Sequence, residues 1–83
     1  MKIRYFAWVR ERIGKPEEEI AIPPQVGTVA DLIAWLGTRG EEYAYAFENP
    51  GVIRAAIDRV HVKPQASLAG ASEIAFFPPM TGG

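Results

Sequence analysis

The sequence predicts a small two-layer α+β domain, with a four- or five-stranded sheet packed on one main helix and a short second helix nearby. Three observations predict it. The chain has 83 residues, 48% of them apolar, which suits one folded domain and excludes two. Short alternating apolar segments near both ends and in the second half indicate strands. One stretch, residues 28–36, has the apolar spacing of an amphipathic helix.

The first expected strand covers residues 2–9, which are rich in aromatic and branched side chains. Alternation places two sets of side chains on opposite faces, Ile3, Tyr5, Ala7 and Val9 on one and Lys2, Arg4, Phe6 and Trp8 on the other. Both faces therefore carry apolar groups, which favours a position inside the sheet.

A turn at residues 14–16 leads to a second expected strand, residues 17–22, with Ile20 and Ile22 on its buried face. Glu17, Glu18 and Glu19 are interpreted as charges that keep an edge strand soluble. The prolines at 23 and 24 end this strand and support its place at the edge of the sheet.

The main helix begins at Thr28, with Asp31 three residues later as in a capping box. Its apolar stripe consists of Val29, Leu32, Ile33 and Leu36, and Trp35 beside it is expected in the core. A short second helix is expected to follow from residue 41, with Tyr43 and Phe47 on one side.

The rest of the chain reads as a hairpin and a final strand. Residues 53–57 and 60–63 alternate around a turn at Asp58-Arg59 whose type stays open. The side chains expected toward the helix are Ile53, Ala55, Ile57, Val60 and Val62. Leu68 is the expected core anchor of the next loop. In the final strand, residues 73–77, both faces are again apolar, so it is expected beside the first strand in the middle of the sheet.

Composition excludes several classes of function. The chain has no cysteine and one histidine, His61, so thiolate chemistry, a histidine metal cluster and a histidine-based triad are not expected. His61 itself is expected to be an exposed side chain. The net charge of -1 is unlike that of a nucleic-acid binder. Neither a membrane span nor a signal peptide is apparent, so we expect a cytoplasmic protein without membrane or nucleic-acid partners.

The segment Pro78-Pro79-Met80-Thr81-Gly82-Gly83 has no charged side chain. Proline restricts the backbone to extended conformations and glycine has no Cβ, so we expect a slim tail, residues 78–83, on a folded domain, residues 1–77. Such a tail could enter a narrow channel and present the α-carboxylate of Gly83. A carboxylate must first be activated, for example as an acyl-adenylate, which requires another enzyme. The diglycine alone favours a flexible end that carries no chemistry, and only its context favours the reactive tail.

The motif Ala75-Phe76-Phe77-Pro78-Pro79-Met80-Thr81-Gly82-Gly83 resembles the end of the small-subunit family of molybdopterin synthase. The segment Phe6-Ala7-Trp8-Val9-Arg10-Glu11, followed by Ile13-Gly14, is similar to the start of that family. The resemblance spans the whole chain, although only its two ends carry specific motifs. It implies the β-grasp, ubiquitin-like fold, in which the first and last strands run parallel at the centre of a mixed sheet.

The resemblance further implies a sulfur carrier without a complete active site of its own. A ubiquitin-activating-like adenylyltransferase would use ATP and magnesium to adenylate Gly83, and sulfur transfer would convert it to a thiocarboxylate. Gly82, Thr81 and Met80 would thread into the large subunit of molybdopterin synthase. There the thiocarboxylate would donate sulfur to cyclic pyranopterin monophosphate, a step of molybdenum cofactor biosynthesis. No metal or cofactor is expected on this chain, and the family implies a heterotetramer.

Some residues depart from the family pattern, and proteins of different function share its features. Met80 stands where Val or Ile is usual, which is an apolar exchange within the tail. Ala69-Gly70-Ala71-Ser72 replaces a more acidic turn and Asp58 replaces an Asn, and these two departures touch turn chemistry and contacts with the activating enzyme. A thiamine-type sulfur carrier would share the fold and the diglycine but lack the Phe-Phe-Pro-Pro lead-in. A ubiquitin-like protein modifier would share the activation step, and a plain interaction module would have a tail without chemistry.

Three aromatic side chains are the expected anchors for the large subunit. If the helix covers the face with Ile74, then Phe6, Trp8 and Phe77 lie together on the open face of the sheet, where such a patch favours docking. Pro78 and Pro79 would guide the tail outward. A different arrangement, in which the short helix or a loop covers these rings, stays open. Arg10 could form a salt bridge to a partner or be a solvated turn charge.

Overall fold

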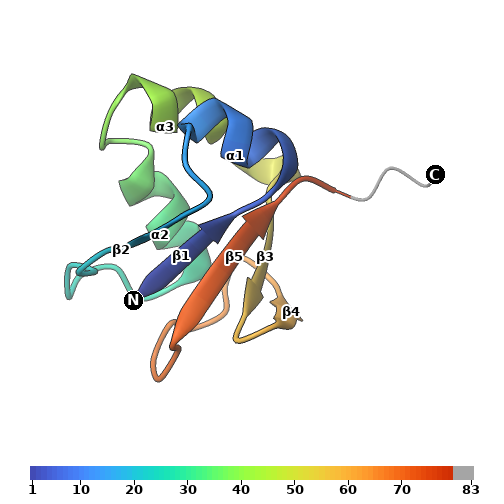
Figure 1. The fold of residues 1–83 in the computed structure, drawn as a ribbon. Coiled ribbons are helices and arrows are strands. Elements are labelled where there is room, and N and C mark those ends of the chain that lie inside the picture. Colours follow the sequence, from blue (N-terminus) through green and yellow to red (C-terminus); the bar gives the residue numbers. More distant parts are fainter. Residues whose placement is uncertain (80–83) are drawn as a thin grey trace.

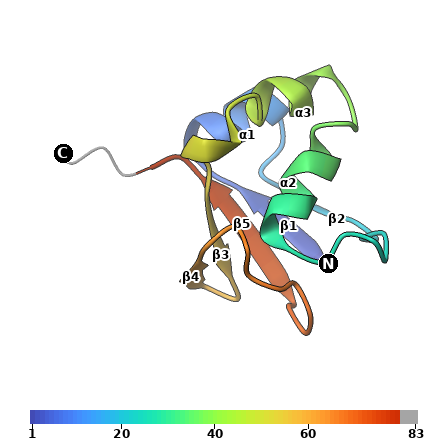
Figure 2. The same cartoon turned by 180° about the vertical axis from the view of Figure 1, so that it is seen from behind.

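The computed structural model describes residues 1–79. Figures 1 and 2 show a five-stranded sheet with α2 across one face and with α1 and α3 packed together at one end. No helix of residues 1–79 covers the other face, which we call the open face. The elements in chain order are β1 (Lys2–Tyr5), α1 (Ala7–Ile13), β2 (Glu17–Glu19), α2 (Val29–Leu36), α3 (Glu41–Ala46), the 3-10 helix η1 (Pro50–Val52), β3 (Arg54–Ile57), β4 (Val60–Val62) and β5 (Glu73–Phe77).

The strand order β2-β1-β5-β3-β4 confirms the expected mixed sheet. Strands β1 and β5 run parallel side by side, with Ile3 level with Ile74 and Tyr5 level with Phe76, and the other pairs are antiparallel. The second strand lies at an edge, as predicted. The core lies between the sheet and the helices, and its fully buried large side chains are Tyr5, Phe76, Ile3, Leu32, Leu36, Ile74, Val9 and Val29.

The main helix forms as the sequence predicts. Thr28 accepts a hydrogen bond from the backbone N–H of Asp31, and the Asp31 carboxylate accepts one from the backbone N–H of Thr28, which completes the capping box. The four apolar residues of the stripe are buried. Helix α3 also forms, and Tyr43 and Phe47 on one side of it are buried.

The expected strand over residues 2–9 is wrong beyond Tyr5. The backbone N–H of Phe6 donates to the carbonyl of Phe76, and the carbonyl of Phe6 then accepts from Val9 and Arg10, which starts α1. Ala7 adopts a left-handed φ of 51°, which turns the chain out of the sheet. Helix α1 ends at Gly14, where a φ of 90° suits a residue without Cβ.

Smaller expectations also need correction. The second strand is shorter than predicted, although Ile20 is buried and Ile22 packs against the core. Asp58 and Arg59 both have positive φ, which identifies the tight primed type of hairpin turn. Val60 is level with Ile57, which is level with the buried Ile74, so it lies on the predicted side of the sheet, but at this edge strand it is 64% exposed and does not join the core. Trp35 is only half-buried at the margin of the core.

Candidate docking site at the carboxyl end of β5

The carboxyl end of β5 brings together side chains from three strands on the open face. Ile74 and Phe76 face the core, so alternation places Phe77 on the open face. Arg54 is the residue level with Phe77 on β3. The His61 ring of β4 packs against Phe77, with 5.2 Å between the ring centroids. Phe77 is half-buried on this face, beside Arg54 and His61.

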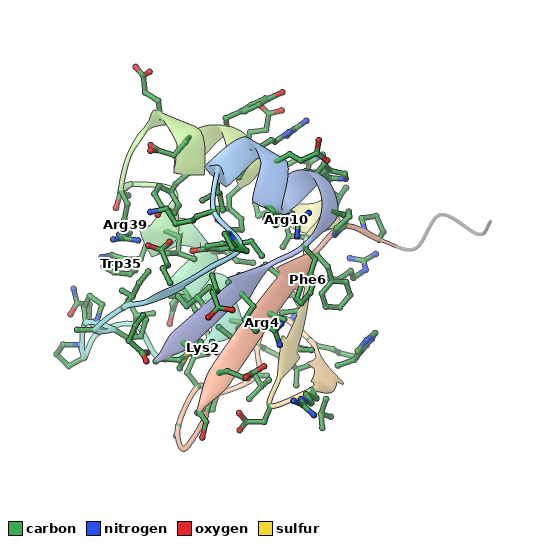
Figure 3. The ribbon with its side chains drawn as sticks, in the orientation of Figure 1. Lys2, Arg4, Phe6, Arg10, Trp35 and Arg39 are labelled. Carbon is green, nitrogen blue, oxygen red and sulfur yellow. The ribbon has the colours of Figure 1, made fainter. Side chains whose placement is uncertain are left out.

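Phe6 extends this aromatic surface on the other side of β5. Its ring is 39% exposed, and the guanidinium carbon of Arg4 lies 5.3 Å from the ring centroid. Figure 3 shows Phe6 beside the carboxyl end of β5, on the side that faces the viewer. The prediction that Phe6 and Phe77 lie together on the open face agrees with this arrangement.

Trp8 does not belong to this surface, contrary to the sequence prediction. It lies on α1 because the strand ends earlier, and it is half-buried against the core. The guanidinium carbon of Arg12 lies 4.5 Å from the Trp8 ring centroid and 4.1 Å from that of Tyr45 on α3. Arg12 thus joins the two helices through their aromatic rings, and Trp8 contributes to the packing of α1 rather than to the aromatic surface at the end of β5.

The remaining predicted docking residues surround the same end of β5. Arg10 is exposed in the last turn of α1, and Figure 3 places it above the end of the sheet. Pro78 and Pro79 follow β5 directly and are half-buried. The predicted reactive residue Gly83 and the predicted threading residues Gly82, Thr81 and Met80 lie outside the described residues 1–79.

Sequence reasoning missed Arg54 and the contact of His61 with Phe77. The signal was present in the hairpin pattern, because a strand that buries Ile53 and Ala55 turns Arg54 to the open face. The pattern does not predict the pairing register of β3 with β5, and this register brings Arg54 level with Phe77.

A second polar cluster, which the sequence analysis also missed, lies at the opposite edge of the sheet. One carboxylate oxygen of Glu18 accepts hydrogen bonds from the Tyr5 hydroxyl at 2.7 Å and the Tyr43 hydroxyl at 2.6 Å. The other oxygen accepts from Arg39 at 3.3 Å and Lys15 at 3.4 Å. Glu18 shares the inward side of β2 with Ile20, so alternation could have separated it from Glu17 and Glu19.

This Glu18 cluster alters the ionisation of its members. Burial of the Glu18 carboxylate favours protonation, but hydrogen bonds from Tyr43, Tyr5 and Arg39 outweigh it and lower the pKa of Glu18 below its ordinary 4.5. Burial first, and then the hydrogen bond to Glu18, raise the pKa of Tyr5 well above its ordinary 10.0. The cluster is therefore most stable with Glu18 ionised and Tyr5 protonated.

Within residues 1–79, no group of three or more His, Asp or Glu side chains could hold a metal ion. No helix of that part of the chain is long and apolar enough to cross a membrane. An apolar hollow of about 470 Å³ lies between α2 and α3, and its lining includes Ala30, Ala34 and Phe47.

Comparison with known proteins places this fold in a defined group. The profile of the ThiS family matches residues 3–83. The chain is 35% identical to the molybdopterin synthase sulfur carrier subunit of Escherichia coli (strain K12), over all of this chain and 99% of that protein. It is 31% identical, with the same coverage, to the molybdopterin synthase sulfur carrier subunit of Haemophilus influenzae.

Two solved structures have a similar fold. SAMP1 from Haloferax volcanii superposes with a TM-score of 0.69 at 24% identity, over all of this chain and 98% of that one. The putative molybdopterin converting factor, subunit 1, from Pyrococcus furiosus superposes with a TM-score of 0.64 at 27% identity, over 94% of each chain. The ubiquitin-like β-grasp fold predicted from the sequence is therefore confirmed.

Proposed function

Since this chain belongs to the ThiS family, we propose that it is the sulfur carrier subunit of a molybdopterin synthase. The observation that carries the proposal is full-length similarity to two sulfur carrier subunits of that enzyme, together with the ending Phe-Phe-Pro-Pro-Met-Thr-Gly-Gly. The fold supports it, because β5 delivers Pro78 and Pro79 from an end of the sheet that exposes aromatic side chains.

In the proposed reaction Gly83 supplies the reactive group. Its α-carboxylate attacks the α-phosphorus of ATP in a ubiquitin-activating-like adenylyltransferase, which uses magnesium, and pyrophosphate leaves. A sulfur nucleophile then displaces AMP and leaves a thiocarboxylate. Sulfur is a softer and stronger nucleophile than carboxylate oxygen, so the thiocarboxylate can attack cyclic pyranopterin monophosphate bound to the large subunit. Water finally cleaves the acyl–sulfur link and regenerates the Gly83 carboxylate.

The described part of the chain acts in this scheme as a docking unit. Phe6 and Phe77 are proposed as the aromatic anchors for the large subunit, because partly exposed aromatic rings beside an interface centre carry much of the binding energy of many complexes. Gly82, Thr81 and Met80 are proposed to thread into the large subunit. The catalytic acid and base groups would belong to that partner, and two copies of each subunit would form the heterotetramer.

Intact-mass measurement tests the function. The chain is incubated with the adenylyltransferase, ATP, magnesium and a sulfur donor, and a variant without Gly83 serves as the control. We expect the mass change for replacement of one oxygen by sulfur in the full chain and no change in the control. Conjugates of higher mass would instead indicate a ubiquitin-like modifier. No change in either chain would contradict a carrier role.

A carrier of another pathway, such as a thiamine-type carrier, requires a separate test. The thiocarboxylate form is mixed with the purified large subunit and cyclic pyranopterin monophosphate. Formation of molybdopterin supports the proposed pathway. A thiocarboxylate that forms but transfers no sulfur to the pterin would contradict it.

A further inference from the structure

The basic side chains of residues 1–79 fall into two groups. Five of them form ion pairs within the chain: Lys2, Arg4, Arg12, Lys15 and Arg39. Four others form no ion pair with the described acidic residues: Arg10, Arg54, Arg59 and Lys63. The chain has 10 acidic and 9 basic residues, so a shortage of carboxylates does not explain why these four cations have no ion pair. Their position is therefore informative.

Three of the four lie at the end of the sheet where β5 finishes. Arg54 is level with Phe77, and Val62 is level with Ala55, so Lys63 follows next to Arg54. Arg54 and Lys63 also line one hollow of about 500 Å³ between α2, η1 and the β3–β4 hairpin. Arg10 lies on the other side of β5, one helical turn beyond Phe6, whose N–H bonds to Phe76. We call Arg10, Arg54 and Lys63 the cationic rim.

The fourth cation lies elsewhere. Arg59 is in the turn between β3 and β4, beside the start of β5, because the carboxylate of Asp58 in the same turn accepts from the backbone N–H groups of Ser72 and Glu73. The turn is at the opposite end of the sheet from Phe77. Arg59 thus supplies a matched control, a cation of the same type with no ion pair among the described residues.

We propose that the cationic rim steers this chain onto an acidic surface of the large subunit, a surface that surrounds the opening into which the tail passes. This inference rests on the proposed function and adds the charge of the partner's surface to it. Exposed charges at the margin of an interface contribute little to the lifetime of a complex but raise the rate of encounter. Arg10 has Glu11 as its neighbour, so most of the field comes from Arg54 and Lys63.

Association kinetics with the purified large subunit of the same organism test the rim. Arg54→Glu, Lys63→Glu and the double variant are compared with Arg59→Glu at about 50 mM and about 500 mM salt, since salt screens exposed charges. We expect the association rate constant of the double variant to fall on the order of tenfold at low salt and to approach that of the unaltered chain at high salt. The dissociation rate constant should change less than twofold. Arg59→Glu should stay within twofold throughout.

The outcomes separate this inference from the function on which it rests. Equal losses in Arg59→Glu and Arg54→Glu, or a loss that high salt does not reduce, would overturn the cationic rim while the carrier role stands. If the unaltered chain forms no complex with the large subunit, both are overturned. Lys63→Glu should keep the fold, because Lys63 lies beyond the last residue of β4 and is exposed, so a lower association rate in this variant would not result from misfolding. Arg54→Gln should give a smaller effect of the same sign as Arg54→Glu.

Discussion

The β2 edge of the sheet and the carboxyl end of β5 differ in whether their charged side chains form ion pairs within the chain. Around β2, Glu17, Glu18 and Glu19 all have cationic partners within the chain, and Glu18 also binds two tyrosine hydroxyls. Around the end of β5, Arg54 donates a hydrogen bond to the Gly51 carbonyl but has no ion pair among residues 1–79, and Phe77 packs against His61 but is partly exposed. Carboxylates that are paired internally stabilise the fold, whereas exposed charges without an ion pair and partly exposed rings are available for a second molecule.

This difference predicts that substitutions near β2 change stability and that substitutions near the end of β5 change docking. Phe77→Asp has the largest expected effect. It should weaken binding to the large subunit about 30-fold or more, because removing an aromatic anchor costs about 2 kcal/mol or more. Titration calorimetry measures the affinity.

The matched control for Phe77→Asp is Val60→Asp, which removes an apolar side chain that is 64% exposed on β4. The control should bind within twofold of the unaltered chain. An equal loss of affinity in the two variants would mean that the exposed aromatic surface has no special role.

Glu18→Ala has the next largest expected effect, and it tests the other side of the comparison. The Tyr5 and Tyr43 hydroxyls would lose their acceptor, and we expect a loss of about 2 kcal/mol in the free energy of unfolding, measured by urea denaturation. Affinity for the large subunit should not change. Glu19→Ala is the control, because that side chain is 75% exposed and its change should cost well under 1 kcal/mol.

The pH dependence of stability gives Glu18→Ala a second readout. The folded-state pKa of Glu18 lies below its ordinary 4.5, so its contribution is present above that pH and is lost as the pH falls through the folded-state pKa. The difference in unfolding free energy between the unaltered chain and Glu18→Ala should therefore shrink in acid. A difference that stays constant from neutral pH into acid would contradict the proposed role of the ionised carboxylate.

Most of the fold follows from local patterns. The apolar stripe and the Thr28–Asp31 cap predict α2, and the two-sided apolarity of the last strand predicts its place inside the sheet. The first strand was placed correctly for a wrong reason, because Phe6 and Trp8 lie beyond its end at Tyr5. The error over residues 7–13 has a physical cause. Ala7, Trp8 and Val9 suit a strand by side-chain type, and the helix depends on a left-handed turn at Ala7 together with packing on α3.

The candidate site was predictable only in part. Phe6 and Phe77 follow from alternation, but the position of Trp8 depends on the missed helix, and Arg54 depends on the strand register. Glu18 was grouped with its neighbours because three consecutive glutamates read as a solvated edge. Alternation with Ile20 could have separated Glu18 from them, but its partners do not follow from the pattern, because Tyr43 is 25 residues away.

Trp8→Ala sharpens the comparison at the boundary between the two regions. The sequence predicts Trp8 on the open face with Phe77, but in the structure Trp8 packs with Arg12 and the core. We expect about 1.5 kcal/mol lower unfolding free energy, from lost packing and a lost cation–π contact, with unchanged affinity for the large subunit. Phe6→Ala should show the reverse pattern. A loss of affinity in Trp8→Ala comparable to that in Phe6→Ala would show that Trp8 also contacts the large subunit.

Tyr5→Phe has the smallest expected effect at neutral pH, a loss of about 1 kcal/mol from one hydrogen bond to Glu18. The raised pKa of Tyr5 means that its hydroxyl stabilises the folded state below the ordinary pKa of 10.0 and that this contribution is lost as the pH rises above it. Urea denaturation between about pH 8 and about pH 11 should therefore show the advantage of the unaltered chain over Tyr5→Phe shrinking with pH. Tyr45→Phe, at a side chain that is 52% exposed, is the control for removal of a tyrosine hydroxyl, and at neutral pH it should cost less than Tyr5→Phe. An advantage over Tyr5→Phe that does not shrink above pH 10 would mean that the Glu18 cluster does not hold Tyr5 in its protonated form.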